Sequence, residues 1–443
     1  MTWDLRLRIL DLTPKIDKSE IRHLKSAIRM MPRNDELIDV QSLMAARSVA
    51  EHCRIAEEYF AQLGDWTHHL SKPFGSIDET PQLLINFAIV LQGLQLCPGM
   101  TVLEFGAGTC WAARILSQLG CKVIAVDVSP TALRIGQELY QRHPPIGDRP
   151  APQFLLFDGQ RIELPDQRVE RVICLDAFHH VPNPKQVLAE LARVLETGGV
   201  AGFAEPGPEH SKTAQSQYEM KTHGVVENDI DMRAVWRDAQ MAGFTDLKLA
   251  IFQVQPMYAG LVQFEDFLQG GKTGKKYTQA TRDFLGNQRN FFLYKGAPKP
   301  RDSRYRQGLT ALISITPKAV SVSEGEVIKL NAVVRNNSEA TWLPRSAGLG
   351  AVMLGCHVRH ADGTVFRESY HWEPLSPDDE HPVQAGETVK FEFRLPGLPR
   401  GRYLIEFDMV SNDVCWFAIN GSQVARIEAE VMSSPEPHAS SVL

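Results

Sequence analysis

A short glycine loop follows an apolar segment in the first half of the chain. Thr101–Phe105 has the pattern of a buried strand, and Gly106 and Gly108 come directly after it. Glycine is needed where the backbone must turn sharply and approach a ligand with no Cβ atom in the way. Glu104 stands two positions before the first glycine. These residues indicate a small-molecule site at the end of the strand.

The next predicted strand, Lys122–Asp127, ends in a carboxylate. A carboxylate at this position suits a ribose diol, because one acidic group can accept hydrogen bonds from two hydroxyls. A dinucleotide fingerprint would also require a third glycine at position 111, to admit a pyrophosphate. That position holds Trp111, whose bulk would block the approach. The loop is therefore predicted to face a ligand that has no pyrophosphate.

The elements that position these residues are predicted by the pattern between residue 81 and about residue 251. Short apolar strands alternate there with helices of regular amphipathic periodicity. Such alternation predicts a parallel sheet covered on both faces, a doubly wound α/β fold of Rossmann-like type. We place this domain at residues 81–295. The predicted strands are 101–105, 122–127, 153–157, 171–175 and 200–204, and the predicted helices include 111–119, 130–141, 184–195 and 232–242.

Four segments of this domain resemble the class I S-adenosylmethionine-dependent methyltransferases. They are Leu103–Thr109 (LEFGAGT), Val126–Pro130 (VDVSP), Phe157–Gly159 (FDG) and Val172–Val181 (VICLDAFHHV). The segments occur in the order and spacing of that family, and the resemblance covers about residues 80–250. It implies a Rossmann-like fold and S-adenosyl-L-methionine as the cofactor.

The resemblance also implies a role for each matching residue. Asp127 would hold the ribose, and Val128 would pack on the adenine. Asp158 would meet the adenine amino group, Glu104 would lie near the amino group of the methionine moiety, and Asp176 would close the site. The full set of cofactor residues implied in this way is Glu104, Gly106, Gly108, Asp127, Val128, Asp158, Gly159 and Asp176.

The methyl acceptor needs a nucleophile held in line with the sulfonium and, where necessary, a base that removes a proton. Candidate bases come from the carboxyl ends of the fourth and fifth strands, at the open edge of the sheet. These candidates are His180, Glu205 and His210. The alternative is structural: the 179–180 histidine pair would mark only a turn before the next helix, and the later residues would cap a long loop. The adjacent histidines 68–69 face different directions on a helix, so no metal site is predicted.

The segment Glu205–Ser211, with Gly224–Glu227 further on, looks like a subset of bacterial methyltransferases found with polysaccharide-making enzymes. That resemblance implies a sugar or glycan-related acceptor.

The flanking regions differ from this domain. Residues 1–80 are predicted to form a helical N-terminal segment, in which Ala45–Leu63 is one amphipathic helix, and a second helix begins at Thr80–Pro81. Residues 296–312 hold prolines and charges without periodicity and are predicted to be a linker. The polar tail at 433–443 is predicted to be disordered.

Residues 313–432 show strands of period two separated by glycine, proline and asparagine turns, which predicts an antiparallel β-sandwich. Asn336–Trp342, Ala385–Val389 and Pro396–Tyr403 resemble the immunoglobulin-like accessory domains attached to bacterial glycan-modifying proteins. The resemblance implies that this domain holds a glycan or packs the catalytic domain into a homodimer. Trp372 and Trp416 could stack on sugar rings or belong to the core.

Composition bounds the partners and the location. A net charge of -6 without a concentrated basic patch argues against nucleic acid and an anionic membrane. The nearest cluster, Lys272, Lys275 and Lys276 beside glycines, is predicted to be a mobile loop. The seven cysteines are scattered and indicate free thiols in a reducing compartment. The N-terminus lacks the apolar core of a signal peptide, and Leu83–Leu96 is too short to span a bilayer. We expect a cytoplasmic protein.

Three functions remain open at this point. The main hypothesis is a methyltransferase that acts on a sugar or glycan in a bacterial cell-surface pathway. The second is a methyltransferase of a small or lipid-linked acceptor whose β-sandwich is purely structural. The third is a non-catalytic glycan-binding or scaffold protein, and the intact Asp127 and loop glycines argue against it.

Overall fold

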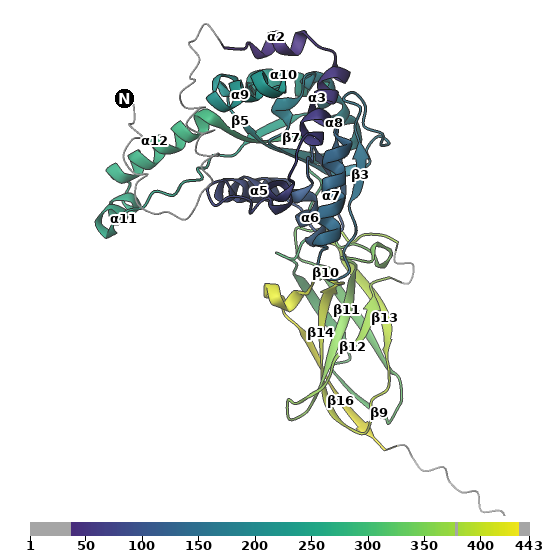
Figure 1. Cartoon of the computed structure of the whole chain (residues 1–443). Helices are drawn as coiled ribbons and strands as arrows, with labels where there is room; N and C mark the ends of the chain where they lie inside the picture. Colours follow the sequence, from purple (N-terminus) through teal and green to yellow (C-terminus); the bar gives the residue numbers. More distant parts are fainter. Residues whose placement is uncertain (1–36, 377–379, 434–443) are drawn as a thin grey trace, which may run out of the picture. The chain divides into compact units, whose positions relative to one another are not determined.

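A computed structural model describes residues 37–376 and 380–433 of the chain. Their contacts form two compact units: the first reaches to Pro298, and the second begins at Lys299 (Figure 1). The beginning of the expected helical N-terminal segment, up to residue 36, lies outside the described residues. The same holds for the expected disordered tail from residue 434 onward.

The first unit contains a seven-stranded sheet in the order β3-β2-β1-β4-β5-β7-β6. Strands β1 to β5 are parallel, and β7 runs antiparallel to both β5 and β6. The predicted Rossmann-like α/β domain is therefore confirmed, with two further strands that the sequence pattern did not reveal. The strands are β1 Thr101–Phe105, β2 Lys122–Asp127, β3 Gln153–Leu156, β4 Val169–Leu175, β5 Leu195–Pro206, β6 Asp246–Leu249 and β7 Gln288–Tyr294.

Helices cover both faces of this sheet because the side chains of a strand alternate between faces. On one face, Phe203 belongs to a cluster with Leu188 of α8 and Val235 of α10. On the other face, a Cβ atom at Gly202 would meet Leu94 of α5 at 3.1 Å. The helices are α5 Thr80–Leu94, α6 Trp111–Gln118, α7 Pro130–Arg142, α8 Pro184–Val194, α9 Ala214–His223 and α10 Met232–Ala242.

The N-terminal helix differs from the prediction of one element over 45–63. The structure has α2 at Val40–Ala45 and α3 at Val49–Ala61, with a short α4 at Thr67–Ser71 after them. Ser48 divides α2 from α3 because its side chain and that of Glu51 form a capping box at the start of α3. The local Ser-x-x-Glu signal therefore overrides the continuous apolar periodicity.

A helical hairpin is inserted between β6 and β7. It consists of α11 at Leu261–Leu268 and α12 at Lys272–Asn287, and Figure 1 shows the two helices side by side, away from the sheet. The lysines that were expected in a mobile loop lie in the first turns of α12, so that prediction was wrong. Among the helices within the described residues, none has the length and hydrophobicity needed to cross a bilayer.

The second unit has a three-stranded sheet, β13-β10-β8, and a larger sheet, β12-β11-β14-β16-β9, with β15 paired to β14. One hydrophobic cluster around Trp342 takes residues from both sheets. The prediction of an all-antiparallel arrangement was wrong in one place, because β9 and β16 are parallel. The strands are β8 Ala311–Thr316, β9 Ala319–Ser323, β10 Ile328–Asn336, β11 Val352–His360, β12 Val365–Pro374, β13 Thr388–Leu395, β14 Gly401–Ser411, β15 Cys415–Trp416 and β16 Ala425–Met432.

Part of the segment that was expected to be a linker, 296–312, is packed. Leu309 is fully buried in the core of the second unit, and Ala311 already begins β8. The Ser303 hydroxyl donates a hydrogen bond to the carbonyl of Gly350 at 2.6 Å. The prolines and charged residues of this segment therefore belong in part to the folded second unit.

Candidate active site

The glycine loop lies where the strand order reverses, because β1 has β2 on one side and β4 on the other. In open α/β sheets, ligands bind at the carboxyl ends of the strands at such a switch point. Gly106 has a φ of 64°, and a Cβ atom there would lie 2.4 Å from the Cβ of Ala177. This glycine is thus required by backbone conformation and by the close approach of the loop after β4.

Asp127 joins the glycine loop to the loop after β2. Its carboxylate accepts the backbone N–H of Gly108 at 2.7 Å and that of Ser129 at 2.8 Å. Each carboxylate oxygen can accept more than one hydrogen bond, so lone pairs are left for a ligand. Burial raises the pKa of Asp127 above its ordinary range. A Cβ atom at Gly108 would meet nothing within 4 Å, so the backbone there borders open space.

Glu104 is a buried carboxyl group with an unused oxygen. Its Oε2 atom has no hydrogen-bond partner among the described residues, and the side chain is 3% exposed. Burial raises the pKa of Glu104 to about 8, and the nearby Asp127 carboxylate adds to that effect. A buried and unpaired carboxyl is costly unless a cation or a donor reaches it. This site therefore has a place for a positively charged ligand group.

Helix α3 packs against the far side of the same region, and the sequence did not indicate this. A Cβ atom at Gly159 would lie 2.6 Å from both Val49 and Cys53 of α3. Glu57 of α3 accepts a hydrogen bond from the Ser129 hydroxyl at 2.6 Å and another from the Thr131 backbone at 3.1 Å, at the start of α7. No local motif links residue 57 to this loop, so only the tertiary structure could reveal the contact.

Asp158 and Val128 lie beside this helix-covered region. Asp158 follows β3, is exposed, and accepts the backbone N–H groups of Gln160 and Arg161 at 2.7 Å each. Val128 is half-buried and packs against the core of the sheet. Glu104, Gly106, Gly108, Asp127, Val128, Asp158 and Gly159 are thus placed at or beside the carboxyl ends of β1, β2 and β3.

Glu205 ends β5 but is fully buried. Its carboxylate accepts the backbone N–H groups of Ala177, Phe178 and His179 at 2.9–3.2 Å and binds the His179 ring nitrogen Nδ1 at 2.7 Å. These bonds hold η2, the short 3-10 turn Phe178–His180. Glu205 was expected to be a catalytic residue; in the structure its buried carboxylate contacts the turn that carries the two histidines.

His179 and His180 differ in exposure and in their hydrogen bonds. His179 is buried, and burial holds its pKa well below the ordinary range. His180 has a side chain that is 45% exposed, and its Nδ1 atom lies 2.7 Å from the carbonyl oxygen of Val226. A carbonyl accepts, so Nδ1 donates and the neutral ring carries its lone pair on Nε2. Among the described residues, Nε2 of His180 has no hydrogen-bond partner.

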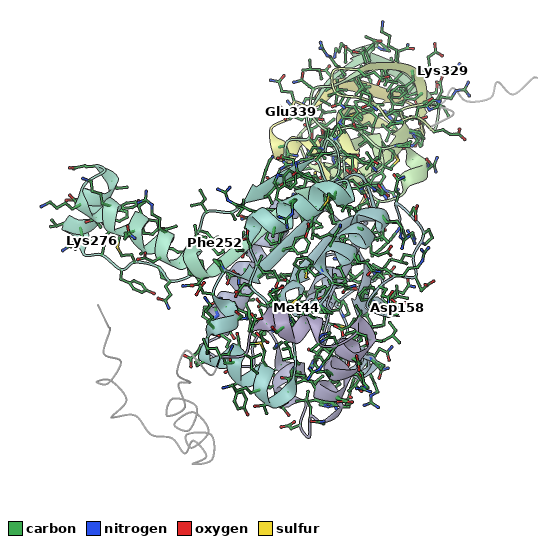
Figure 2. All side chains as sticks on the ribbon, turned by 90° about the horizontal axis from the view of Figure 1, so that it is seen from above. Met44, Asp158, Phe252, Lys276, Lys329 and Glu339 are labelled. Atoms are coloured by element: carbon green, nitrogen blue, oxygen red, sulfur yellow. The ribbon has the colours of Figure 1, made fainter. Side chains whose placement is uncertain are left out.

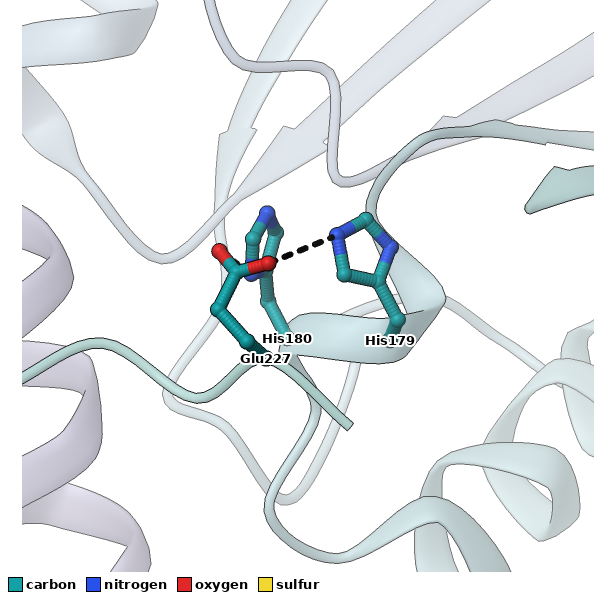
Figure 3. Close-up of side chains that lie close together, drawn as sticks. All are labelled: His179, His180 and Glu227. Carbon is teal, nitrogen blue, oxygen red and sulfur yellow. Dashed lines mark ion pairs between the residues drawn. The ribbon is translucent and has the colours of Figure 1, made fainter. Parts of the chain in front are cut away.

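Glu227 lies close to three histidines, and Figure 3 shows it beside His179 and His180. Its carboxylate is 4.0 Å from Nε2 of His179, 3.6 Å from Nδ1 of His180 and 2.8 Å from Nε2 of His210. Burial alone would raise the pKa of Glu227, but the His210 hydrogen bond and the neighbouring imidazoles lower it below its usual value. The structure therefore brings His180 and His210 together around a carboxylate that the sequence did not single out as catalytic.

Comparisons with known proteins agree with this geometry. A family described as methyltransferase domain matches residues 103–203. A demethylmenaquinone methyltransferase of Renibacterium salmoninarum is 28% identical over 143 residues, which is 32% of this chain and 56% of that protein. A 2-methyl-6-phytyl-1,4-hydroquinone methyltransferase of Synechocystis sp. is 27% identical over 152 residues, which is 34% of this chain and 41% of that protein. A solved structure of Haemonchus contortus phosphoethanolamine N-methyltransferase 2 aligns with 14% identity and a TM-score of 0.35, over 54% of this chain and 61% of that one.

This chain carries an S-adenosylmethionine-dependent methyltransferase domain. The matches span about half the length of the curated relatives or less. The predicted enzyme class and cofactor are confirmed at the level of this domain.

The side chains of the methyltransferase domain fit the cofactor chemically. S-adenosylmethionine has an amino group and a ribose diol, and the sulfonium supplies an electrophilic methyl group when it is bound. The unpaired oxygen of Glu104 suits the amino group, and Asp127 retains acceptor capacity for hydroxyls.

Asp176 has the left-handed φ of 49° and directly follows β4. Its side chain is open to solvent at this edge, yet the surrounding protein and the Glu205 carboxylate raise the pKa of Asp176 to about 6. The methyltransferase domain thus places Asp176 between the glycine loop and the histidines.

The sequence predicted no metal, but the structure brings His179, His180 and Glu227 together, with one ligand atom of each within 4.8 Å of the others. These are donor types that a divalent cation accepts. Coordination through Nδ1 of His180 would require loss of its bond to the Val226 carbonyl.

Proposed function

We propose that the protein transfers a methyl group from S-adenosyl-L-methionine to a hydroxyl of a sugar or glycan-related acceptor, with His180 as the general base. The observation that carries this proposal is the His180 ring: its Nδ1–H is held by the Val226 carbonyl, and its Nε2 is free at the open edge of the sheet. A base must reach the proton it removes, and His180 is the most exposed imidazole of the cluster.

The reaction moves one proton from the acceptor hydroxyl to the protein. As the acceptor oxygen forms its bond to the methyl carbon, its proton passes to Nε2 of His180. The imidazolium that results is stabilised by the Glu227 carboxylate, 3.6 Å from the ring. The Glu205 carboxylate accepts the backbone N–H groups of Phe178 and His179 in η2, and this fixes the orientation of His180. His210 keeps Glu227 in place through its 2.8 Å hydrogen bond.

The second unit supports a glycan acceptor, and we propose that it is an immunoglobulin-like β-sandwich. Trp342 belongs to its core, but Trp372 and Trp416 lie on the outer face of the larger sheet, with ring centroids 6.0 Å apart at 86°. A Cβ atom at Gly355 would lie 2.4 Å from the Trp416 ring, so glycine there lets the indole lie against the strand. Partly exposed indoles of this kind stack on the apolar faces of sugar rings. The resemblance of Glu205–Ser211 to polysaccharide-pathway enzymes supports the same acceptor class.

A lipid or lipid-linked acceptor is the second candidate. It is favoured by the relatives, two of which are named as methyltransferases of demethylmenaquinone and of a phytyl-hydroquinone. The exposed apolar side chains of α11 also favour it. A sugar carried on a lipid would satisfy both sets of observations. The free cysteines among the described residues suit the reducing cytoplasm, where we place the protein.

Transfer of a labelled methyl group to sugar, glycan, quinone and lipid-linked glycan acceptors tests the proposal. The His180→Ala variant should lose about 10²- to 10⁴-fold in kcat, the usual contribution of a general base, while its affinity for the cofactor stays unchanged. His143→Ala, an exposed histidine at the end of α7, is the matched control and should keep full activity. An unchanged kcat in His180→Ala would remove this residue from the mechanism. Transfer to the quinone alone would replace the sugar acceptor with the lipid one.

A further inference from the structure

The α11–α12 hairpin exposes large apolar side chains that no part of the described chain covers. Leu261 and Val262 are each 73% exposed and Leu268 is 67% exposed, and Tyr258, just before α11, is 93% exposed. Leu261, Phe264 and Leu268 are spaced by three and four positions, so they lie on one face of α11. Figure 2 shows the hairpin extending from the rest of the first unit, with Phe252 at its base and Lys276 near its far end.

The hairpin is nevertheless internally ordered. Phe267 of α11 packs edge-on against Tyr277 of α12 with ring centroids 5.7 Å apart, and Phe252 does the same with Phe284 at 5.3 Å. Asp266 accepts the backbone N–H of Thr273 at 2.7 Å and so ties the start of α12 to α11. The hairpin is therefore a folded element. Other side chains form the contacts between its two helices, so the exposed apolar face of α11 is not used to hold them together.

Positive charge is concentrated at the start of α12, whereas α11 itself carries Glu265 and Asp266. Lys272, Lys275 and Lys276 occupy the first turns of α12, are exposed, and form no ion pair among the described residues. They stand out in a chain whose net charge is -6. An apolar helix face flanked by unpaired lysines is the pattern of helices that lie in the interface of an anionic bilayer.

A second copy of the chain fits the hairpin less well. A two-fold contact places the same patch against itself, so the lysines of both copies would gather around one interface. Anionic headgroups would instead neutralise these lysines while the acyl region accepts the apolar side chains.

The hairpin ends next to the end of β5. The carbonyl of Asn287, the last residue of α12, accepts the N–H of Gly207 at 2.8 Å, just after β5. Gln288 pairs with Pro206 in the same register. The chain runs from Gly207 directly to His210, which contacts Glu227. The C-terminal end of the hairpin is thus joined to the segment that leads to His210.

We propose that the α11–α12 hairpin docks this protein onto an anionic lipid surface. The apolar face of α11 enters the interface, and the lysines of α12 contact the headgroups. This docking goes beyond the proposed methyl transfer and does not depend on it. It replaces the expectation, drawn from the net charge and from the lack of a concentrated basic patch in the sequence, that an anionic membrane is not a partner.

Flotation with vesicles tests the docking and requires neither cofactor nor acceptor. The full chain should float with phosphatidylcholine vesicles that contain about one-third phosphatidylglycerol, and not with phosphatidylcholine alone. Added salt should weaken the binding, because the headgroup contacts are screened. The triple variant K272Q/K275Q/K276Q should bind about 100-fold more weakly, at roughly fivefold per lysine. L261D/L268D should bind at least tenfold more weakly, since aspartate cannot enter the interface.

Two matched variants control for charge and hydrophobicity. K122Q/K185Q/K329Q removes exposed lysines outside the hairpin, and Ile146→Asp removes an exposed apolar side chain elsewhere in the first unit. Both controls should bind like the parent chain. Absence of vesicle binding by the parent chain, or equal binding by all variants, would overturn the proposal. A dimer that is lost in L261D/L268D and shows no vesicle binding would assign the patch to a second copy instead. Methyl transfer measured in parallel keeps failure of docking distinct from failure of catalysis.

Discussion

Glu104 offers the sharpest test of how the cofactor is bound. Its pKa of about 8 means that most of these carboxyls are protonated at pH 7 in the empty protein. If the carboxylate pairs with the cofactor's amino group, binding must release that proton. We therefore expect up to one proton released per cofactor at pH 7 and an affinity that rises up to tenfold per unit between pH 6.5 and 7.5.

The Glu104→Gln variant removes the titration and leaves the shape of the side chain. At pH 7, ionising Glu104 costs about 1.4 kcal/mol, and a charge-assisted hydrogen bond contributes about 1.5–3 kcal/mol, so the variant should lose only up to about 1.5 kcal/mol of binding. Its affinity should be independent of pH, and its binding should release no proton at this site. Glu163→Gln, an exposed surface change, is the control and should behave like the parent chain.

Calorimetric titration in two buffers of different ionisation enthalpy measures the released protons directly. A parent chain that releases none, with an affinity flat between pH 6.5 and 7.5, would refute the pairing of Glu104 with a cationic group. Thermal unfolding adds an independent check. A carboxyl whose folded pKa is raised stabilises the fold below its unfolded pKa of 4.5, and that stability is lost as the pH rises towards 8. Glu104→Gln should therefore remove part of the loss of stability between pH 5 and 8.

Further predictions concern the rest of the site. Asp127→Ala should weaken cofactor binding in calorimetry by about 1.5–3 kcal/mol per lost hydrogen bond; unchanged affinity would remove it from the ribose site. Gly106→Ala should lower the Tm more than Gly147→Ala, because both have positive φ but only Gly106 lies against Ala177; equal shifts would contradict this account. Asp176→Asn should abolish any change in cofactor affinity near pH 6, since the amide neither gains nor loses a proton there. A chelator should leave methyl transfer unchanged, and activity restored by added zinc or manganese would favour a metal in the histidine cluster.

The elements with strong local patterns were predictable from the sequence. Lys122–Asp127 and Met232–Ala242 have the same limits in the prediction and in the structure, because each is bounded by local signals: a glycine before the strand, and Asp231 as the cap of the helix. Strand β7 was missed because it is antiparallel and joins β5 across a long insertion. The lysines at the start of α12 were misread as a loop, since contacts such as Phe267–Tyr277 that order the hairpin are tertiary.

The residues of the candidate site also fall into two groups: those that local motifs predicted and those that only the fold brings together. The cofactor residues were named from motifs whose spacing follows directly from a strand and its loop. Glu205 was expected to act on the acceptor because it ends a strand, but three N–H groups from another loop converge on it and bury it. Glu227 was noted only as one polar residue in a loop. Its contact with His180 and His210 forms only because the chain bends back after α9.

Helix α3 bears on how this protein divides into folding modules. The segment that matches the methyltransferase family begins at Leu103, whereas Glu57 accepts hydrogen bonds from Ser129 and Thr131 at the start of α7, and Val49 and Cys53 cover Gly159. A chain truncated before residue 80 would keep Ser129 as the cap of α7 but would lose the Glu57 contacts, and it would expose the loop after β3. The segment that matches the family is therefore shorter than the segment that packs together in the fold. We expect a stable fragment to need α3, which ends at Ala61, well before β1 begins at Thr101.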